Sequence, residues 1–257
     1  MLDEMLFSQK KSVVLTSATL STDGGFGHIA ERTGFLDSDE LLVGSPFDYP
    51  RSALICVPSD MPDPNSADYQ SALTDAIADA TLAAEGHSMA LFTSYASLRR
   101  TATSLRQKFA ATGITVLAQG SDGSPQQIIR RFIENPRSVI LGTSSFWEGV
   151  DLAGDVLKVL MVARLPFSVP TDPVFSARSE LYDNAFMEYS VPQAILRLRQ
   201  GFGRLIRTKQ DRGVAILLDG RLSSRRYGKS FLNSLPPGTI KSCKLEELNS
   251  EIVGWLD

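Results

Sequence analysis

Residues 200–207 carry two arginines at a spacing that could do phosphate chemistry. They read Gln-Gly-Phe-Gly-Arg-Leu-Ile-Arg and stand shortly before an apolar run, residues 213–218, that is typical of a buried strand. If the segment is helical, Arg204 and Arg207 share one face, because residues three and four apart are neighbours on a helix. Two guanidinium forks on one face suit a triphosphate, whose oxygens gain charge during hydrolysis. An amphipathic helix with solvated arginines is the alternative for an isolated Arg-x-x-Arg pair.

A second polar segment follows the apolar run 138–141. In α/β proteins, ligands bind beyond the carboxyl ends of the strands, so a polar segment at that place is a candidate site. The segment reads Gly142-Thr143-Ser144-Ser145-Phe146-Trp147-Glu148-Gly149-Val150-Asp151-Leu152-Ala153-Gly154.

Together these two segments resemble motifs V and VI of superfamily 2 helicases. Four more segments occur in order before or between them, and the set is similar to the C-terminal half of a DinG-type helicase, a bacterial relative of the XPD family. The resemblance covers about residues 13–235. The four segments are Leu15-Thr16-Ser17-Ala18-Thr19-Leu20, Gly44-Ser45-Pro46-Phe47-Asp48-Tyr49-Pro50, Phe92-Thr93-Ser94-Tyr95 and Arg164-Leu165-Pro166-Phe167-Ser168-Val169-Pro170.

The resemblance implies a motor in which two RecA-like domains close on ATP. The first domain supplies the phosphate loop and the carboxylates for Mg²⁺, and the second supplies arginine fingers, here Arg204 and Arg207. An arginine finger is worth about 10³–10⁵ in rate where GTPases have been measured. The other residues that the resemblance assigns to ATP are Gln200, Gly203, Glu148, Gly149 and Asp151.

Some of these assignments leave alternatives open. Asp151 suits the ribose hydroxyls or an ion pair with a motif VI arginine, and it could instead be an acid at a helix N-terminus, stabilised by the dipole. Gly203 either permits tight packing or is a mere helix irregularity. Phe146 and Trp147 either stack on bases, at roughly 1–3 kcal/mol per base, or belong to the core.

Hydroxyls at the ends of expected strands are suited to the phosphate oxygens of a nucleic-acid strand. The resemblance implies that the partner is single-stranded DNA, and we expect it to be bound by Thr93, Ser94, Tyr95, Thr143, Ser144 and Ser145. By the resemblance, translocation runs in the 5′ to 3′ direction.

The segment with Thr16, Ser17 and Thr19 resembles motif III, which couples the nucleotide state to the hold on the strand. Residues 12–16 read as a buried strand, and in the family this motif belongs to the first motor domain. We therefore expect residues 1–50 to be a remnant of that domain with a connector, and residues 51–257 to be the C-terminal RecA-like domain.

The sequence contains no G-x-x-x-x-G-K-[ST] loop and no Asp-Glu-Ala-His-type motif. We expect ATP and Mg²⁺ to be bound mainly by an N-terminal motor domain that is a partner within the same protein, with no metal ligands in this chain. His28 and His87 stand alone. The chain by itself is expected to be inactive.

Composition sets the class of protein. The chain of 257 residues has 43% apolar and 21% charged residues, an ordinary globular composition. Its net charge of −3 argues against a nucleic-acid-binding surface that is basic throughout. A local basic surface is still possible, because basic residues are concentrated within residues 197–212. Two cysteines are too few for a disulfide framework or an iron–sulfur cluster and favour a reducing cytoplasm. The start of the sequence is acidic, unlike a signal peptide, and the longest apolar run is too short for a membrane span.

Strand and helix patterns alternate along the chain, which predicts an α/β fold with a mostly parallel sheet and helices on both faces. Expected strands are 53–57, 88–93, 114–119, 138–142, 156–163 and 214–219. Expected helices are 26–33, 66–85, 96–111, 125–134, 173–188, 192–206, 225–235 and 245–256.

Two other classes of function remain open: a stand-alone nucleic-acid-binding or regulatory domain without ATPase activity, and an interaction scaffold with vestigial motifs. Intact Gln200, Arg204, Arg207 and Asp151 favour the motor, because a domain freed from catalysis has no physical reason to keep both arginines.

Overall fold

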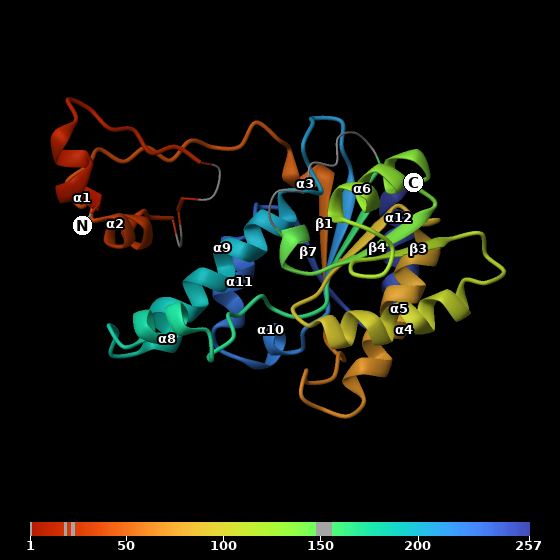
Figure 1. Cartoon of the computed structure of the whole chain (residues 1–257). Helices are drawn as coiled ribbons and strands as arrows, with labels where there is room; N and C mark the ends of the chain where they lie inside the picture. Colours follow the sequence, from red (N-terminus) through yellow and green to blue (C-terminus); the bar gives the residue numbers. More distant parts are fainter. Residues whose placement is uncertain (1, 18–19, 22–23, 148–155) are drawn as a thin grey trace.

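The computed structural model describes residues 2–17, 20–21, 24–147 and 156–257. Within this part of the chain, seven strands form one sheet in the order β3-β4-β2-β5-β6-β1-β7, and every neighbouring pair is parallel (Figure 1). The strands are β1 (Ala53–Pro58), β2 (Ser88–Leu91), β3 (Thr115–Ala118), β4 (Ser138–Gly142), β5 (Val159–Val162), β6 (Gly213–Leu217) and β7 (Thr239–Cys243).

Helices connect the strands and precede the first one. The α-helices are α1 (Leu2–Met5), α2 (Gly27–Thr33), α3 (Tyr49–Ser52), α4 (Tyr69–Ala83), α5 (Tyr95–Lys108), α6 (Pro125–Glu134), α7 (Ser144–Trp147), α8 (Pro173–Ser179), α9 (Val191–Phe202), α10 (Arg221–Ser224), α11 (Gly228–Ser234) and α12 (Leu248–Leu256). Shorter or wider helical turns are η1 (Phe7–Gln9), η2 (Phe186–Ser190), which is a π-helix, and η3 (Leu245–Glu247).

The sheet separates two hydrophobic layers. Helices α4, α5 and α12 pack on one face, and α6, α7, α9 and α11 pack on the other. Strands β1, β2, β4, β5 and β6 are buried along their whole length, as expected for parallel strands covered on both faces. The expected α/β fold with a parallel sheet between two helical layers is confirmed.

Helix α6 shows why the exact bounds of some elements could be predicted from the sequence. The Ser124 side chain accepts a hydrogen bond from the backbone N–H of Gln127, and the Gln127 side chain accepts one from Ser124 N–H, which makes a capping box. Pro125 occupies the first helical position, where its missing N–H costs nothing. The helix spans Pro125–Glu134, as predicted.

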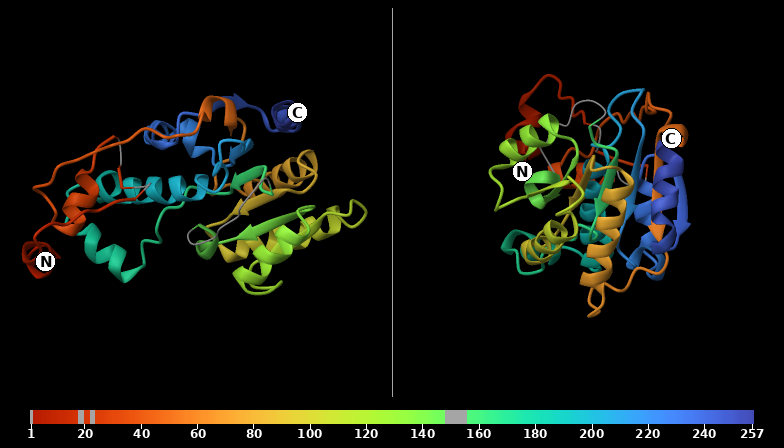
Figure 2. Two further views of the ribbon diagram at one scale, coloured as in Figure 1. Left: turned by 90° about the horizontal axis from the view of Figure 1, so that it is seen from above. Right: turned by 90° about the vertical axis from the view of Figure 1, so that its right-hand side faces the viewer.

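The predicted strand over residues 12–16 is wrong. These residues are not in the sheet, and Val14 is 83% exposed. They belong to the N-terminal arm (residues 2–48 as described), which lies beside α8 and α9, away from the β3 end of the sheet (Figures 1 and 2). A strand forms only where a neighbour takes its backbone hydrogen bonds, and none of the strands in the described part of the chain adjoins the segment.

Two predicted helices differ from the structure. The helix expected over 173–188 divides into α8, a turn and η2, and η2 continues directly into α9. The helix expected over 192–206 ends at Phe202, because Leu205 and Ile206 turn into the hydrophobic core. Strand β7 was not predicted, since four of its five side chains are exposed and it lacks the apolar run of a central strand.

Among the described residues, no helix has the length and apolar character that crossing a membrane requires.

Gly142 is required by its neighbour Phe146. A methyl group added at Gly142 would lie 2.4 Å from Phe146 Cγ, and Phe146 is fully buried. We predict that Gly142→Ala lowers the free energy of unfolding by about 1–3 kcal/mol, the usual cost of overpacking a core. Thermal melting followed by circular dichroism measures it.

Gly254→Ala is the matched control for this substitution. Gly254 lies in α12 with no atom within 4 Å of the added methyl group, so the change improves helix propensity without a clash. Equal melting temperatures for the two variants would contradict the packing described for Phe146.

Candidate nucleotide and nucleic-acid interface

Polar residues gather at the carboxyl edge of three neighbouring strands. Gln119 follows β3, Thr143 follows β4, and Thr93 comes two residues after β2. Because β3, β4 and β2 are adjacent and parallel, these side chains lie along one edge of the sheet. This is the edge at which α/β proteins bind ligands.

The Gln119 side chain forms hydrogen bonds to several residues at this edge. Its Oε1 accepts from the Thr143 backbone N–H at 2.7 Å and from the Thr143 hydroxyl at 3.0 Å. Its Nε2 donates to the Tyr95 hydroxyl at 2.8 Å and to Ser145 Oγ at 3.4 Å. One buried amide therefore joins residues that follow three strands.

The residues predicted to contact DNA fall into two groups. Thr93, Tyr95 and Ser145 are exposed, Tyr95 at 46%. Ser94 is half-buried and caps α5, where its side chain accepts from Ser97 N–H, and Thr143 is 4% exposed behind the surface. The backbone of Ser144 lies in α7, and its side chain is outside the described part of the structure.

Gln119 itself was missed as a site residue. The expected strand 114–119 included it as the last residue, and a polar residue at the carboxyl end of a parallel strand is the signal that could have found it.

Trp147 links the segments at this edge to α9. Its indole N–H donates to the Phe92 carbonyl at 3.1 Å, and its ring packs against Gly201. Both Trp147 and Phe146 are buried in the core, so the alternative that they stack on bases is wrong and the core alternative is confirmed.

The two motif VI arginines lie beyond the end of α9. The chain leaves the helix through tighter turns, with Arg204 N–H bonded to Gly201 O at 3.2 Å and Leu205 N–H to Phe202 O at 3.0 Å. A shared helical face for Arg204 and Arg207 required a helix through both residues, and this condition is not met, because α9 ends at Phe202.

Arg204 and Arg207 have different surroundings. Arg204 is 6% exposed, and its Nη2 donates to the Trp147 carbonyl at 2.8 Å, which joins the motif VI segment to the motif V segment. Arg207 is half-buried, and its backbone N–H donates to Asp211 Oδ2 at 2.7 Å.

Asp211 fixes the loop that carries Arg207. Its carboxylate also accepts from the Thr208 backbone N–H at 2.8 Å and from the Thr208 hydroxyl at 2.6 Å. Burial raises the pKa of Asp211, but these hydrogen bonds and the Arg207 charge together outweigh it and lower the pKa below its usual value. Asp211 is therefore ionised at neutral pH, and the loop loses these bonds only as the pH falls through that lowered pKa.

The two glycines of the motif VI segment also differ. A methyl group at Gly201 would lie 3.0 Å from Trp147 Cε3 and 3.1 Å from Leu91 Cδ1, so this position requires close packing. At the exposed Gly203 the methyl group would meet the Arg199 carbonyl at an ordinary 3.4 Å. The chain's own packing therefore does not explain Gly203. Gln200 is half-buried on the last turn of α9.

The motif III segment reaches α9 from the N-terminal arm. Thr16 and Ser17 are exposed, and the Arg199 guanidinium donates to the carbonyl of Ser21, which is buried. Burial lowers the pKa of Arg199, and the nearby Tyr49 phenol acts in the opposite direction. Four predicted site residues, Thr19, Glu148, Gly149 and Asp151, lie outside the described residues.

Within the described ranges, no group of three or more histidine, cysteine, aspartate or glutamate side chains is placed to hold a metal ion.

The parallel sheet between two helical layers, with polar residues at its carboxyl edge, is a RecA-like fold. Residues 77–238 match the family described as helicase C-terminal domain, which is more than half of the chain, and the chain belongs to this family.

Curated relatives agree with this assignment. The chain is 37% identical over 251 residues to the ATP-dependent DNA helicase YoaA of Haemophilus influenzae, which covers 96% of this chain and 38% of that protein. It is 36% identical over 264 residues to the 3'-5' exonuclease DinG of Bacillus subtilis, covering 99% of this chain and 28% of that protein. The chain thus spans roughly a third of the length of these relatives. The resemblance to DinG-type helicases is confirmed.

Two solved structures share the fold. One is named XPD_APO, with a TM-score of 0.56 and 17% identity, covering 75% of this chain and 40% of that chain. The other is Dbp5 of S. cerevisiae bound to RNA and ADP BeF3, with a TM-score of 0.55 and 11% identity. This match covers 91% of the present chain and 54% of the Dbp5 chain. At these identities the likeness concerns the fold alone.

Gln119 offers a test of how the edge is built. Gln119→Leu keeps much of the volume but leaves the buried N–H and hydroxyl of Thr143 without this acceptor. We predict a loss of about 1–3 kcal/mol in the free energy of unfolding, the cost of an unsatisfied buried polar group. Denaturant titration measures it, and faster hydrogen exchange at Thr143 N–H should accompany it.

Gln126→Leu, on the exposed surface of α6, is the control and should change stability by no more than about 0.5 kcal/mol. If both variants unfold at the same denaturant concentration, Gln119 does not organise the edge.

Proposed function

We propose that this chain is the C-terminal motor domain of an ATP-dependent DNA helicase whose ATP site is completed by an upstream RecA-like domain. The observation that carries the proposal is the direct contact between the motif V and motif VI segments, Arg204 Nη2 to Trp147 O at 2.8 Å. This contact brings the arginine loop to the end of β4, next to the hydroxyls at the sheet edge.

Arg204 and Arg207 are the proposed arginine fingers. During hydrolysis, charge moves onto the γ-phosphate and leaving oxygens, and a fixed guanidinium stabilises that charge without reorganising. The Asp211 carboxylate fixes the backbone of Arg207, and the Trp147 carbonyl fixes the guanidinium of Arg204. The Arg204 guanidinium and the backbone of Arg207 are therefore held in place before a nucleotide arrives.

The remaining nucleotide contacts are proposed for Gln200, Gly203, Glu148, Gly149 and Asp151. Gly203 is exposed and its own chain leaves room for a methyl group, which fits close approach by a nucleotide or by the facing domain. The phosphate loop and the Mg²⁺ carboxylates come, in this proposal, from the upstream domain, because the sequence has no such loop.

Single-stranded DNA is the proposed track, along the edge formed by β3, β4 and β2. Thr93, Tyr95 and Ser145 are exposed there and suited to phosphate and base contacts, while Ser94 and Thr143 brace the loops behind them. Ser144 completes the predicted set. Phosphate contacts of this kind carry no sequence information, which suits a motor that moves along any strand.

Residues 1–50 are proposed to be a remnant of the first motor domain with a connector, and residues 51–257 the C-terminal domain. The arm exposes large apolar side chains, including Leu36 at 76% and Leu41 at 80%, which an adjoining domain would cover. In this view Thr16, Ser17 and Thr19 couple nucleotide to DNA, and the Arg199 contact to Ser21 joins their segment to α9.

A stand-alone nucleic-acid-binding domain without ATPase activity is the competing function. Both functions predict that the isolated chain does not turn over ATP, so only a protein with an upstream motor domain separates them.

The arginines give the decisive prediction. In a protein that joins this chain to an upstream domain with a phosphate loop, Arg207→Ala should lower DNA-stimulated ATP turnover by about 10³-fold or more, with little change in nucleotide affinity or melting temperature. Arg204→Ala should lower turnover and also the melting temperature, because the buried contact to Trp147 is lost. Steady-state turnover, nucleotide binding and thermal melting are measured on the same variants.

Lys209→Ala is the matched control, since Lys209 is exposed on the same loop. Arg207→Lys should restore little, because an ammonium cannot reproduce the planar fork. Near-normal turnover in Arg207→Ala and Arg204→Ala would remove the arginine-finger role and favour the competing function.

Nucleic-acid binding is testable on this chain alone. Binding of labelled oligo-dT should be independent of sequence and weaken as salt rises, with log K falling by about 0.7 per phosphate contact for each tenfold rise in salt. Ser145→Glu should weaken it by like-charge repulsion, whereas Thr103→Glu, on an exposed face of α5, should not. Salt-independent binding, or equal effects of the two variants, would count against the proposed track.

A further inference from the structure

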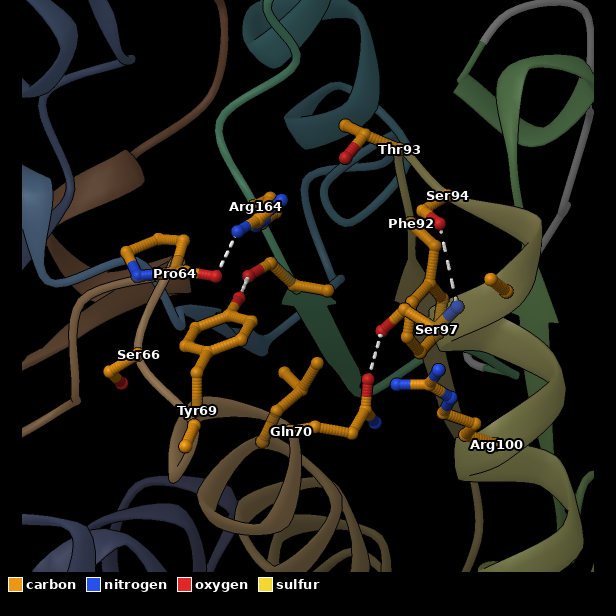
Figure 3. Close-up of a pocket in the computed structure, with 14 residues that line it drawn as sticks. Pro64, Ser66, Tyr69, Gln70, Phe92, Thr93, Ser94, Ser97, Arg100 and Arg164 are labelled. Atoms are coloured by element: carbon orange, nitrogen blue, oxygen red, sulfur yellow. Dashed lines mark hydrogen bonds between the residues drawn. The ribbon is translucent and has the colours of Figure 1, made fainter.

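A preformed pocket opens beside the proposed track, between the ends of β2 and β5. It has a volume of about 310 Å³, and its lining includes Thr93 and Ser94 after β2, Arg164 after β5, and Arg100 on α5 (Figure 3). None of these arginines was among the residues predicted to bind DNA.

The sheet topology explains why a pocket forms here. The chain leaves β2 through α5 on one face of the sheet and goes to β3, whereas it leaves β5 through α8 and α9 and goes to β6. Strands β2 and β5 are neighbours, so their connections run in opposite directions from one point of the edge. Such a switch point leaves a crevice, and ligands of open α/β sheets bind there.

The walls of the pocket are held by buried and partly buried hydrogen bonds. The Gln70 side chain joins α4 to α5, accepting from Ser97 Oγ at 2.7 Å and donating to Thr101 Oγ1 at 3.0 Å. The Tyr69 hydroxyl bonds to the Ala163 carbonyl and lies 3.1 Å from the Leu218 carbonyl. These bonds need no ligand, so the pocket does not have to be assembled on binding.

The charge of the lining selects the ligand. The lining residues include two arginines and several hydroxyls, and none of them is a carboxylate. The Arg164 guanidinium lies 5.3 Å above the Tyr69 ring and donates to the Pro64 carbonyl, which fixes it at the mouth of the pocket. Arg100 is exposed on the α5 side (Figure 3). An anion with hydrogen-bond acceptors suits this lining.

We propose that this pocket binds one nucleotide unit of a single strand, with its backbone phosphate taken by Arg100 and Arg164. This inference rests on the proposed function, since Thr93 and Ser94 belong both to the pocket and to the DNA-binding edge. The volume lies at the lower end of the roughly 300–1,000 Å³ typical of small-ligand pockets, which suits one nucleotide rather than a duplex. The strand thus leaves the exposed edge and enters the switch-point crevice.

The test compares two neighbouring arginines of α5 in the 257-residue chain. Both side chains are exposed, and Arg100 lines the pocket whereas Arg99 does not. Each is changed to glutamine, and binding of labelled oligo-dT is measured by fluorescence anisotropy over a range of salt. Arg100→Gln should make the slope of log K against log salt shallower by about 0.7, one phosphate contact on a single strand, and Arg99→Gln should leave the slope unchanged.

Two further arms separate the possible outcomes. Competition with inorganic phosphate tests whether the site takes any phosphate, and efficient displacement of oligo-dT by phosphate alone would overturn binding of a nucleotide unit. Ala67→Trp, on the exposed rim, narrows the pocket without removing charge and should also weaken oligo-dT binding.

The Ser145→Glu variant distinguishes this inference from the proposed function. If Ser145→Glu weakens oligo-dT binding while Arg100→Gln and Arg99→Gln behave alike, the pocket is not used and the DNA-binding edge stands. If the unmodified chain binds no oligo-dT, both the edge and the pocket are overturned.

Discussion

The burial of Trp147 is the constraint on which the rest of the candidate site depends. A buried indole N–H needs an acceptor, and it finds one in the Phe92 carbonyl directly after β2. The ring can pack this closely against α9 only because residue 201 has no side chain. Its backbone carbonyl then accepts from Arg204. One residue therefore fixes the relative positions of three segments that are far apart in the sequence.

A second constraint is the exclusively parallel sheet. Parallel strands bring all their carboxyl ends to one edge, so every loop that follows a strand competes for the same space. Side chains in this space hydrogen-bond to two elements at once. Gln119 bonds to the segments after β2 and β4, and Gln70 on α4 bonds to two residues of α5. The edge is consequently rigid, and its exposed hydroxyls sit on a fixed support, as a site that must hold a phosphate in place requires.

Sequence reasoning succeeded where the signal is local or continuous. The capping box at Ser124 predicts where α6 begins, and the apolar run predicts β4, without any knowledge of distant residues. Both α6 and β4 lie where the sequence predicts them. It failed where a distant contact decides. Gly203 directly after Phe202 is the C-cap of α9 and weakens the helix locally, but the sequence could not show that Leu205 and Ile206 then turn into the hydrophobic core. Residues 12–16 have a strand pattern, but no strand among the residues that the structure describes lies next to them. Gln119 is important because Thr143 and Tyr95 reach it from other loops.

The contacts of Trp147 also suggest how nucleotide and DNA could communicate in the proposed motor. Arg204 bonds to the Trp147 carbonyl, and the Trp147 indole bonds to the carbonyl of Phe92, the residue before Thr93. Close packing gives this chain of contacts little freedom, since the ring is buried and lies against Gly201 with no room for a side chain there. Because Arg204 stays bonded to the Trp147 carbonyl, a displacement of the Trp147 backbone when an upstream domain closes would shift the arginine and the loop that carries Thr93 and Ser94 together. The proposed nucleotide contact and the edge where the strand is proposed to bind are thus coupled through one side chain.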